Sequence, residues 1–152
     1  MNIKMSDWKE AKNDSFYKYV DTATLSENYV DELIKKGGES STGRARYCLH
    51  ANAEAVQQLM LIYHDERTCV PVHRHKSNGE FIILLKGSCD VIFMNENFDV
   101  DKIMKLDARF ISSPVWIPSM IWHTLRITSK FCLFFESTIG PFREGNIDVA
   151  PN

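Results

Sequence analysis

The chain has 152 residues, of which 44% are hydrophobic and 25% are charged. This length is typical of a single compact domain, and the composition argues against a second domain and against long disordered segments. Eighteen Lys and Arg residues against 20 Asp and Glu residues give a formal charge of −2. Such a balance indicates neither a general nucleic-acid binder nor a polybasic membrane anchor.

The apolar runs are far shorter than the roughly 20 residues that cross a bilayer, and the amino terminus has no apolar signal segment. We therefore expect a cytoplasmic protein that does not insert into a membrane. The four cysteines, Cys48, Cys69, Cys89 and Cys132, show no paired spacing, so we expect reduced thiols. A thiolate nucleophile or metal ligand among them is the alternative.

A helix is expected in an amino-terminal extension that covers residues 1–45. Apolar residues recur there at helical spacing, at Leu25, Tyr29, Val30, Leu33 and Ile34. Ser26 is available as an amino-terminal cap, and the pair Gly37-Gly38 is expected to end the helix after about three turns. The extension should therefore pack one apolar helical face on the rest of the domain.

The pattern changes to short β-rich runs from Leu59 onward. Eight strands are predicted over residues 59–63, 70–75, 80–86, 89–94, 99–106, 115–117, 122–128 and 131–137. Turn residues separate several of them, and no helical crossover lies between them. This arrangement predicts an antiparallel sandwich or barrel over residues 46–143, followed by a carboxy-terminal tail at 144–152.

One group of polar residues carries potential chemistry. His73 and His75 alternate along a predicted strand, so both imidazoles lie on the same face. Glu80 begins the next strand, and His123 begins a later strand after a turn at Pro118. Three imidazoles and one carboxylate suit a divalent first-row metal, although these ligands do not distinguish Fe, Mn, Ni, Cu and Zn. An HxH pair alone is more often made of surface or hydrogen-bonded histidines.

The coordination number decides what such a site does. Four protein ligands on a six-coordinate ion leave two positions for substrate or dioxygen, which a catalyst requires. A closed tetrahedral site would be structural instead.

The spacing of these residues resembles a known pattern. HxH, four residues, Glu, six residues and Gly (His73 to Gly87), followed by PxxxxH (Pro118 to His123), resemble the two motifs of the cupin superfamily. The resemblance implies a mostly β, antiparallel double-sheet, jelly-roll-like barrel, with His73, His75, Glu80 and His123 as metal ligands. The chain departs from the motifs at three positions, where Arg67, Met120 and Ile127 replace the usual Gly, Gly and Asn.

A closer similarity extends over about residues 25–143. The segments RARYCLH, QLMLIY, PVHRHKSNGE, ILLKG, VWIPSMIWHTL and FESTIGPF resemble the WbuC family of cupin-fold metalloproteins. Members of that family occur in bacterial gene clusters for O-antigen and other surface polysaccharides. The resemblance implies the fold and the metal site, but no particular reaction.

Several other residues are candidates for the pocket. His50 and Tyr63 are candidate proton-transfer groups, although a hydrogen-bonded structural histidine is the alternative for His50. Arg44 and Arg46 suit capture of a carboxylate or phosphate, with exterior salt bridges as the alternative. Arg126 is a candidate for binding a sugar hydroxyl, and Trp116 for stacking on a sugar ring or for packing in the core. Arg74 should face away from the site, and His64 should be solvated.

Three functions follow from these residues. The first is metal-assisted proton transfer or isomerisation on a sugar or nucleotide sugar in surface-polysaccharide synthesis. The second is a non-haem iron dioxygenase, and the third is a non-enzymatic carbohydrate-binding or regulatory protein. For each of them the expected partner is a small carbohydrate, and a homodimer is expected because edge strands and the helix offer apolar surface.

Overall fold

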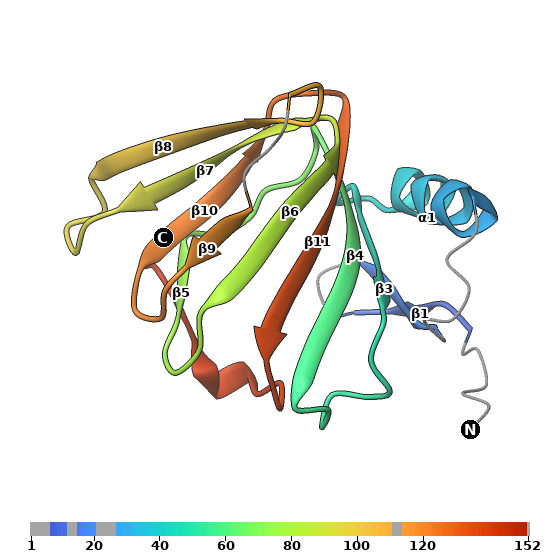
Figure 1. Cartoon of the computed structure of the whole chain (residues 1–152), viewed down its shortest axis with the longest axis horizontal. Coiled ribbons are helices and arrows are strands. Elements are labelled where there is room, and N and C mark those ends of the chain that lie inside the picture. The colour runs from blue at the N-terminus through green and yellow to red at the C-terminus, as the bar shows by residue number, and fades with distance from the viewer. Residues whose placement is uncertain (1–6, 12–14, 21–26, 111–113, 152) are drawn as a thin grey trace.

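The computed structural model describes residues 7–11, 15–20, 27–110 and 114–151. Two β-sheets face each other, and one helix lies outside the larger sheet (Figure 1). In spatial order the larger sheet contains β1 (Lys9–Glu10), β2 (Phe16–Tyr19), β3 (Arg44–Cys48), β4 (Gln57–Asp65), β11 (Phe131–Ile139), β6 (Glu80–Lys86) and β9 (Val115–Ile117). The smaller sheet contains β12 (Ile147–Val149), β5 (His73–His75), β10 (Trp122–Ile127), β7 (Ser88–Met94) and β8 (Val100–Asp107).

Every strand pairing is antiparallel except that of β2 with β3. The predicted fold class, a mostly β, antiparallel double-sheet barrel of jelly-roll type with an amino-terminal helix, is confirmed. All eight predicted strands are present, with ends that differ by a few residues. No helix in the described part of the chain is long and apolar enough to span a bilayer.

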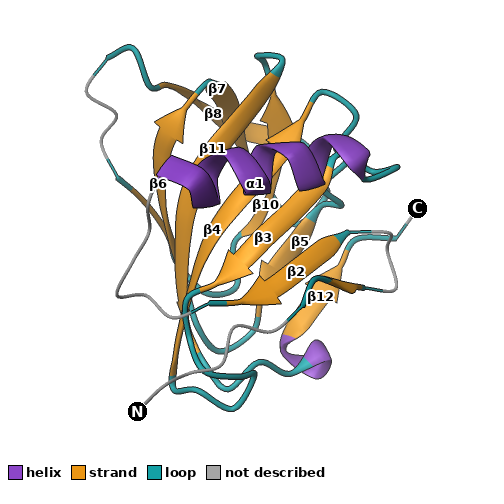
Figure 2. Ribbon diagram, turned by 90° about the vertical axis from the view of Figure 1, so that its right-hand side faces the viewer, coloured by secondary structure: helices purple, strands orange, loops and turns teal. Residues whose placement is uncertain are grey.

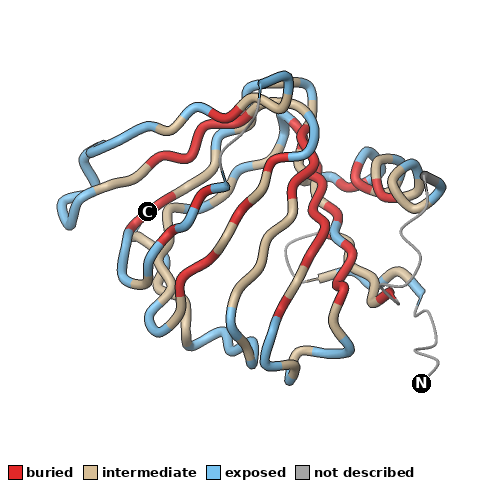
Figure 3. The backbone as a smooth tube through the Cα atoms, in the orientation of Figure 1, coloured by how far each residue is buried: buried red, intermediate tan, exposed pale blue. Residues whose placement is uncertain are grey.

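Apolar side chains fill the space between the two sheets. In Figure 3 buried stretches, drawn in red, run along strands of both sheets. Because side chains alternate along a strand, each strand gives every second residue to this interior. Met60 and Ile62 enter from β4, Ile82 and Leu84 from β6, and Phe134 from β11. These residues form the apolar interior between the two sheets.

A second apolar layer joins α1 (Glu27–Glu39) to the outer face of the larger sheet. Figure 2 shows the helix crossing that face over β3 and β4. Tyr29, Val30, Leu33 and Ile34 pack there, which confirms the predicted apolar helical face, and Leu33 is fully buried. Both faces of β4 are therefore covered, and this explains why the middle of this strand is apolar on both sides.

The helix does not end at the glycine pair, so that prediction is wrong. It continues through Gly37 and Gly38 to Glu39. A Cβ atom on Gly37 would lie 2.0 Å from the ring of Tyr63, so glycine at this position allows close packing rather than ending the helix. The predicted cap Ser26 and the apolar Leu25 lie outside the described residues.

Both terminal segments of the expected division contribute strands to the sheets. The extension at residues 1–45 supplies strands β1 and β2 and the start of β3 to the larger sheet. At the other end, β12 lies within the expected tail and pairs with β5, which carries His73 and His75. Both terminal segments are thus built into the barrel by pairings between residues distant in sequence.

Two departures from the cupin motifs have structural explanations. Met120 has φ +65°, in the left-handed region that favours glycine, and its backbone N–H donates to the carbonyl of His75. Arg67 binds the Asp65 carboxylate and donates to the carbonyl oxygens of Gly37 and Gly38. Arg67 therefore ties the carboxy-terminal end of α1 to the turn after β4.

Candidate metal centre

The first two candidate ligands lie on one short strand. His73 and His75 are the ends of β5, and alternation along this strand turns both rings to the same side. His123 on the neighbouring strand β10 is the register partner of His73, and the centroids of their two rings are 4.3 Å apart. The sheet pairing therefore brings His123 to the HxH pair, although 50 residues separate them in sequence.

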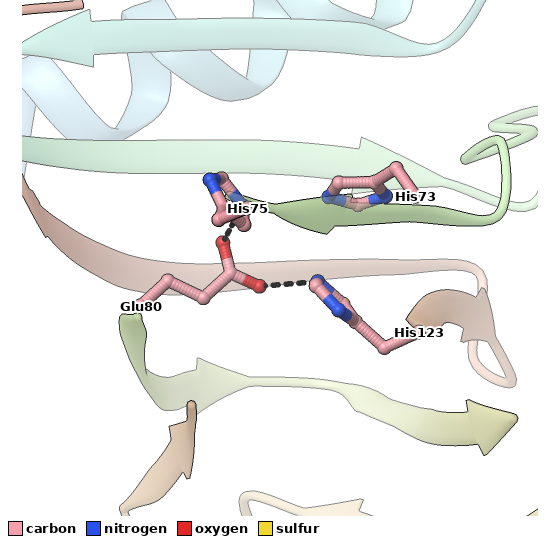
Figure 4. Close-up of side chains that lie close together, drawn as sticks. All are labelled: His73, His75, Glu80 and His123. Carbon is pink, nitrogen blue, oxygen red and sulfur yellow. Dashed lines mark ion pairs between the residues drawn. The ribbon is translucent and has the colours of Figure 1, made fainter. Parts of the chain in front are cut away.

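Glu80 approaches from the opposite sheet as the first residue of β6 (Figure 4). Its Oε2 lies 3.1 Å from Nε2 of His75, and its Oε1 lies 2.8 Å from Nε2 of His123. Glu80 and His123 are almost fully buried, with 4% and 1% of their surfaces exposed. The turn between β5 and β6 connects the two sheets and thus brings the carboxylate to the histidines of the opposite sheet.

Hydrogen bonds to the backbone orient two of the imidazoles. Nδ1 of His73 lies 2.9 Å from the carbonyl oxygen of Pro71, and Nδ1 of His123 lies 2.8 Å from that of Ile121. A neutral imidazole that donates through Nδ1 keeps the lone pair on Nε2, so both rings offer Nε2 to the centre of the group.

The four residues fit a metal ion. One ligand atom from each of His73, His75, Glu80 and His123 lies within 4.8 Å of the others. Nε2 of His75 and Nε2 of His123 are buried, and neither makes a well-aligned hydrogen bond with a described residue. A cation at the centre would satisfy both atoms, and the donor set of three imidazoles and one carboxylate suits Fe, Mn, Ni or Zn.

The charge states also favour a cation. Burial opposes ionisation of Glu80, but the close imidazoles of His123 and His75 outweigh it and hold the pKa of this carboxyl below its usual range. Burial, followed by the nearby His123, lowers the pKa of His73 and so favours the neutral ring that metals bind. The close carboxylate of Glu80 raises the pKa of His75. A metal ion would compete with that proton.

The structure places Arg44 and Arg46 on the face of β3 that looks into the barrel, opposite to Ala45 and Tyr47. Arg46 is exposed there and forms no ion pair with a described residue. Arg44 donates to the carbonyl of Cys69, and burial lowers its pKa. Of these two candidates, Arg46 is the exposed one and has the Cys48 thiol as its side-chain neighbour, so its guanidinium group is the more accessible to an anionic ligand.

His50 is used by the backbone of β4. Its Nδ1 lies 3.1 Å from the N–H nitrogen of Leu59, which donates to it, and its ring meets that of Tyr19 edge-on at 5.7 Å. Burial, with a smaller contribution from Arg46, lowers the pKa of His50. This placement matches the alternative of a hydrogen-bonded structural histidine more closely than a proton shuttle.

Three other candidates lie on outer faces, which contradicts the expectation that they line the pocket. Tyr63 belongs to the layer under α1, where it bonds to Asp65 and stacks on Phe131 with ring centroids 5.5 Å apart. Arg126 pairs with Asp90 at 2.5 Å, and Trp116 is 56% exposed. The sequence correctly places these residues on strands, but the direction of the alternation could not be assigned from it.

Two further histidine and arginine predictions have opposite outcomes. Arg74 faces outward as expected and pairs with Glu96 and Asp148. His64 is not solvated: its Nδ1 is buried, its ring meets Phe134 at 5.2 Å, and burial lowers its pKa to about 3. Because β4 extends to Asp65, His64 lies inside a strand rather than in a turn.

One inward-facing residue was missed by the sequence analysis. Glu136 on β11 has Met60 on β4 and Ile82 on β6 as its register partners, and both of these pack in the interior. It is half-buried and makes no hydrogen bond or ion pair with a described residue. Its segment, FESTIGPF, was noticed only for its similarity to a family, and the acid within it was the available signal.

Solved structures confirm a cupin-type fold. CapF of Staphylococcus aureus, described as a capsular polysaccharide assembling protein, matches with a TM-score of 0.53 and 13% identity over 65% of this chain and 29% of CapF. Oxalate decarboxylase of Bacillus subtilis matches with a TM-score of 0.51 and 15% identity, over 68% of this chain and 26% of the decarboxylase. This chain thus spans less than a third of the length of either protein.

The sugar 3,4-ketoisomerase QdtA of Thermoanaerobacterium thermosaccharolyticum is nearer in size. It matches with a TM-score of 0.50 and 18% identity, over 59% of this chain and 64% of QdtA. No protein with a curated description matches the chain. Residues 25–106, more than half of the sequence, match the family described as a domain of unknown function, DUF6016, and the chain belongs to that family.

Proposed function

We propose that this protein is a divalent-metal-dependent enzyme that acts on a sugar or nucleotide sugar in the synthesis of bacterial surface polysaccharide. The observation that carries the proposal is the convergence of four ligand atoms within 4.8 Å, with two buried imidazole nitrogens that lack aligned partners. His73, His75, Glu80 and His123 would hold the ion. When bound, it would act as a Lewis acid that polarises a carbonyl or hydroxyl group of the substrate.

The inner face of the larger sheet offers groups that suit a carbohydrate ligand. Tyr17 and Tyr19 lie on this face, with ring centroids 6.0 Å apart, and Tyr17 is the register partner of Arg46. Aromatic rings stack on the apolar faces of sugars, and a guanidinium group binds phosphate or carboxylate through paired hydrogen bonds. These groups would hold the substrate while its reacting atoms reach the metal centre.

Two structural neighbours support the choice of substrate class. QdtA is described as a sugar 3,4-ketoisomerase and CapF as a capsular polysaccharide assembling protein. The similarity of FESTIGPF and the other segments to the WbuC family points to the same kind of pathway.

The test begins with elemental analysis of untagged protein. We expect about one equivalent of a divalent metal in the wild type, and its loss in the variants His75→Ala and Glu80→Ala. Nucleotide sugars are then screened for melting-temperature shifts that require the metal, and those that bind are incubated with the protein and analysed for products by NMR. Wild-type protein without metal after supplementation, or turnover unchanged in both variants, would overturn the proposal.

The same experiment separates the other two functions. A non-haem iron dioxygenase would consume dioxygen in an oxygen-electrode assay, whereas proton transfer proceeds anaerobically. A binding or regulatory protein would show metal-dependent ligand affinity without any product.

A cytoplasmic homodimer is part of this proposal. Apolar residues on the outer face of the larger sheet, Leu59, Phe81, Ile83 and Phe135, line an open groove of about 320 Å³ that α1 does not cover. Light scattering that shows a monomer at micromolar concentration would contradict the dimer.

A further inference from the structure

Most of the FESTIGPF segment has a structural explanation. The hydroxyl of Thr138 donates to the carbonyl of Gly79 at 3.0 Å, directly before the candidate ligand Glu80. Asn78 donates to the carbonyl of Ile139 at 2.8 Å. A Cβ atom on Gly140 would lie 2.1 Å from the carbonyl oxygen of Ala55. These contacts hold the turn between β5 and β6 and so position Glu80.

Glu136 has no such explanation. It lies between Met60 and Ile82 on the inner face, and no described residue donates a hydrogen bond to its carboxyl group. A polar group removed from water without a partner destabilises a fold, so its presence among apolar side chains calls for another role. Glu136 also lies outside the group of four that converge on the metal centre.

The register of the sheet places Glu136 beside that centre. Thr138 on β11 is opposite Glu80 on β6, and Glu136 is opposite Ile82. Glu136 and Glu80 are therefore diagonal neighbours on one face, a separation of about 7–8 Å between positions. A ligand that extends between the two carboxyl groups can therefore contact the metal centre and Glu136 at the same time.

Burial and the charges near Glu136 bring the pKa of its carboxyl close to neutral pH, so that both the protonated and the ionised form are accessible. Burial and then the charge of Glu80 raise its pKa to about 8, while Arg46 and His75 act in the opposite direction. A group that exchanges protons efficiently has a pKa near the working pH. Tyr63 lies on the outer face, and the ring of His50 accepts a hydrogen bond from the backbone of β4, so both are less suitable for proton transfer in the barrel.

We propose that Glu136 is the proton-transfer residue of this site, acting on a keto sugar that also carries an anionic group bound by Arg46; this inference rests on the proposed function. The Glu136 carboxylate takes the proton from the hydroxyl-bearing carbon next to the substrate carbonyl, the C–H electron pair forms a C=C bond, and the carbonyl π pair moves onto its oxygen to give an enediolate. The carboxylic acid so formed returns the proton to the former carbonyl carbon, while the proton of the neighbouring hydroxyl passes to the former carbonyl oxygen and that hydroxyl becomes the new carbonyl. The sum is an isomerisation with no net oxidation or reduction.

The test compares Glu136→Gln with the wild type and with Ser137→Ala, a control on the same strand whose side chain faces outward. Phosphoglycolohydroxamate, an enediolate analogue that carries a phosphate, serves as the probe with metal-loaded protein. Titration calorimetry in two buffers of different ionisation enthalpy counts the protons taken up on binding. A TDP-linked 4-keto sugar in D2O reports exchange at carbon by NMR.

We expect all three proteins to hold the same amount of metal. At a pH above about 8, where Glu136 is mostly ionised before binding, wild type and Ser137→Ala should take up more protons per probe bound than Glu136→Gln, by up to about one, and affinity should fall at least about tenfold in Glu136→Gln. Deuterium exchange should be lost in Glu136→Gln alone. If that variant folds poorly, Glu136→Leu, which matches the apolar neighbours, replaces it with the same expectations.

Each other result counts against a specific step. Equal proton uptake and affinity in metal-loaded wild type and Glu136→Gln would overturn the role of Glu136 and leave the proposed function standing. Loss of metal in Glu136→Gln, or no probe binding by loaded wild type, would also overturn that role. Wild-type protein that binds no metal would overturn the proposed function itself.

Discussion

The position of Glu136 makes a prediction about stability that needs no substrate. In the unfolded chain this carboxyl ionises near its usual pKa of 4.5, whereas in the folded protein burial and then the charge of Glu80 raise its pKa to about 8. Between these two values the folded state holds a proton that the unfolded state has released. The stability of the metal-free protein should therefore fall as the pH rises through this range.

The magnitude follows from the difference between the two pKa values. Each pH unit within the range lowers the free energy of unfolding by at most about 1.4 kcal/mol. Since Glu136 is only half-buried, water reduces the effect, and we expect a loss of about 1–2 kcal/mol between pH 5.5 and pH 7.5. Glu136→Gln is neutral at every pH and should lack this loss.

Urea unfolding of chelator-treated protein, followed by tryptophan fluorescence at four pH values from 5.5 to 8.5, measures the effect. His75, whose pKa the close Glu80 carboxylate raises, also loses its contribution to stability as the pH increases. The part of that contribution that comes from Glu80 is present in both proteins, and the smaller part that comes from Glu136 is lost with Glu136, so the comparison uses the difference between their slopes. Parallel slopes would refute the inward placement of an unpaired Glu136.

Three further outcomes are expected. Gly37→Ala should lower the free energy of unfolding by about 2 kcal/mol because its Cβ atom would overlap the ring of Tyr63. Gly38→Ala has open space around it and should raise the free energy of unfolding by up to about 1 kcal/mol. Equal effects of the two substitutions in urea unfolding would contradict the packing described. Glu80→Gln should weaken metal binding at least about tenfold. Metal at 100 times the wild-type Kd should then stabilise the wild type by about 2.7 kcal/mol and the variant by at most about 1.4 kcal/mol, which calorimetry and melting temperatures test. Arg67→Lys should lower the free energy of unfolding by about 1 kcal/mol because lysine lacks the planar guanidinium group that binds both Asp65 and the end of α1. An unchanged midpoint in urea would argue against this contribution of Arg67.

The metal centre could be predicted because most of it is local in sequence. His73 and His75 share a face through the two-residue repeat of a strand, and Glu80 returns to them across a short turn. His123 required a pairing between distant strands, and only the similarity to a known pair of motifs supplied it. The sheet pairing of His123 with His73 supplies the physical reason.

The strands at the edges of the fold could not be predicted in this way. β2 pairs in parallel with β3, and β12 pairs with β5 from the far end of the chain. The segment IDV in β12 is too short to show a two-residue repeat, and its neighbour in space lies more than 70 residues away. Such strands are held by partners rather than by their own sequence pattern.

The sequence also did not show which side chains of the covered strands point into the barrel. Strand β4 reads QQLMLIYHD, and it is apolar on both faces because the barrel interior covers one side and α1 the other. Alternation alone then gives no reason to place Tyr63 outward and Ile62 inward. The helix that covers the outer face thus explains why Tyr63 was expected in the pocket.

The same ambiguity applies to β11, but there one contact resolves it. A slip of one residue between β11 and β6 would turn Ser137 into the barrel and Glu136 outward. It would also move Thr138 away from the carbonyl of Gly79, the contact that holds the turn before Glu80. The hydroxyl that positions the metal ligand therefore also sets the face on which Glu136 lies, so the two carboxyl groups can approach the same ligand only in this register.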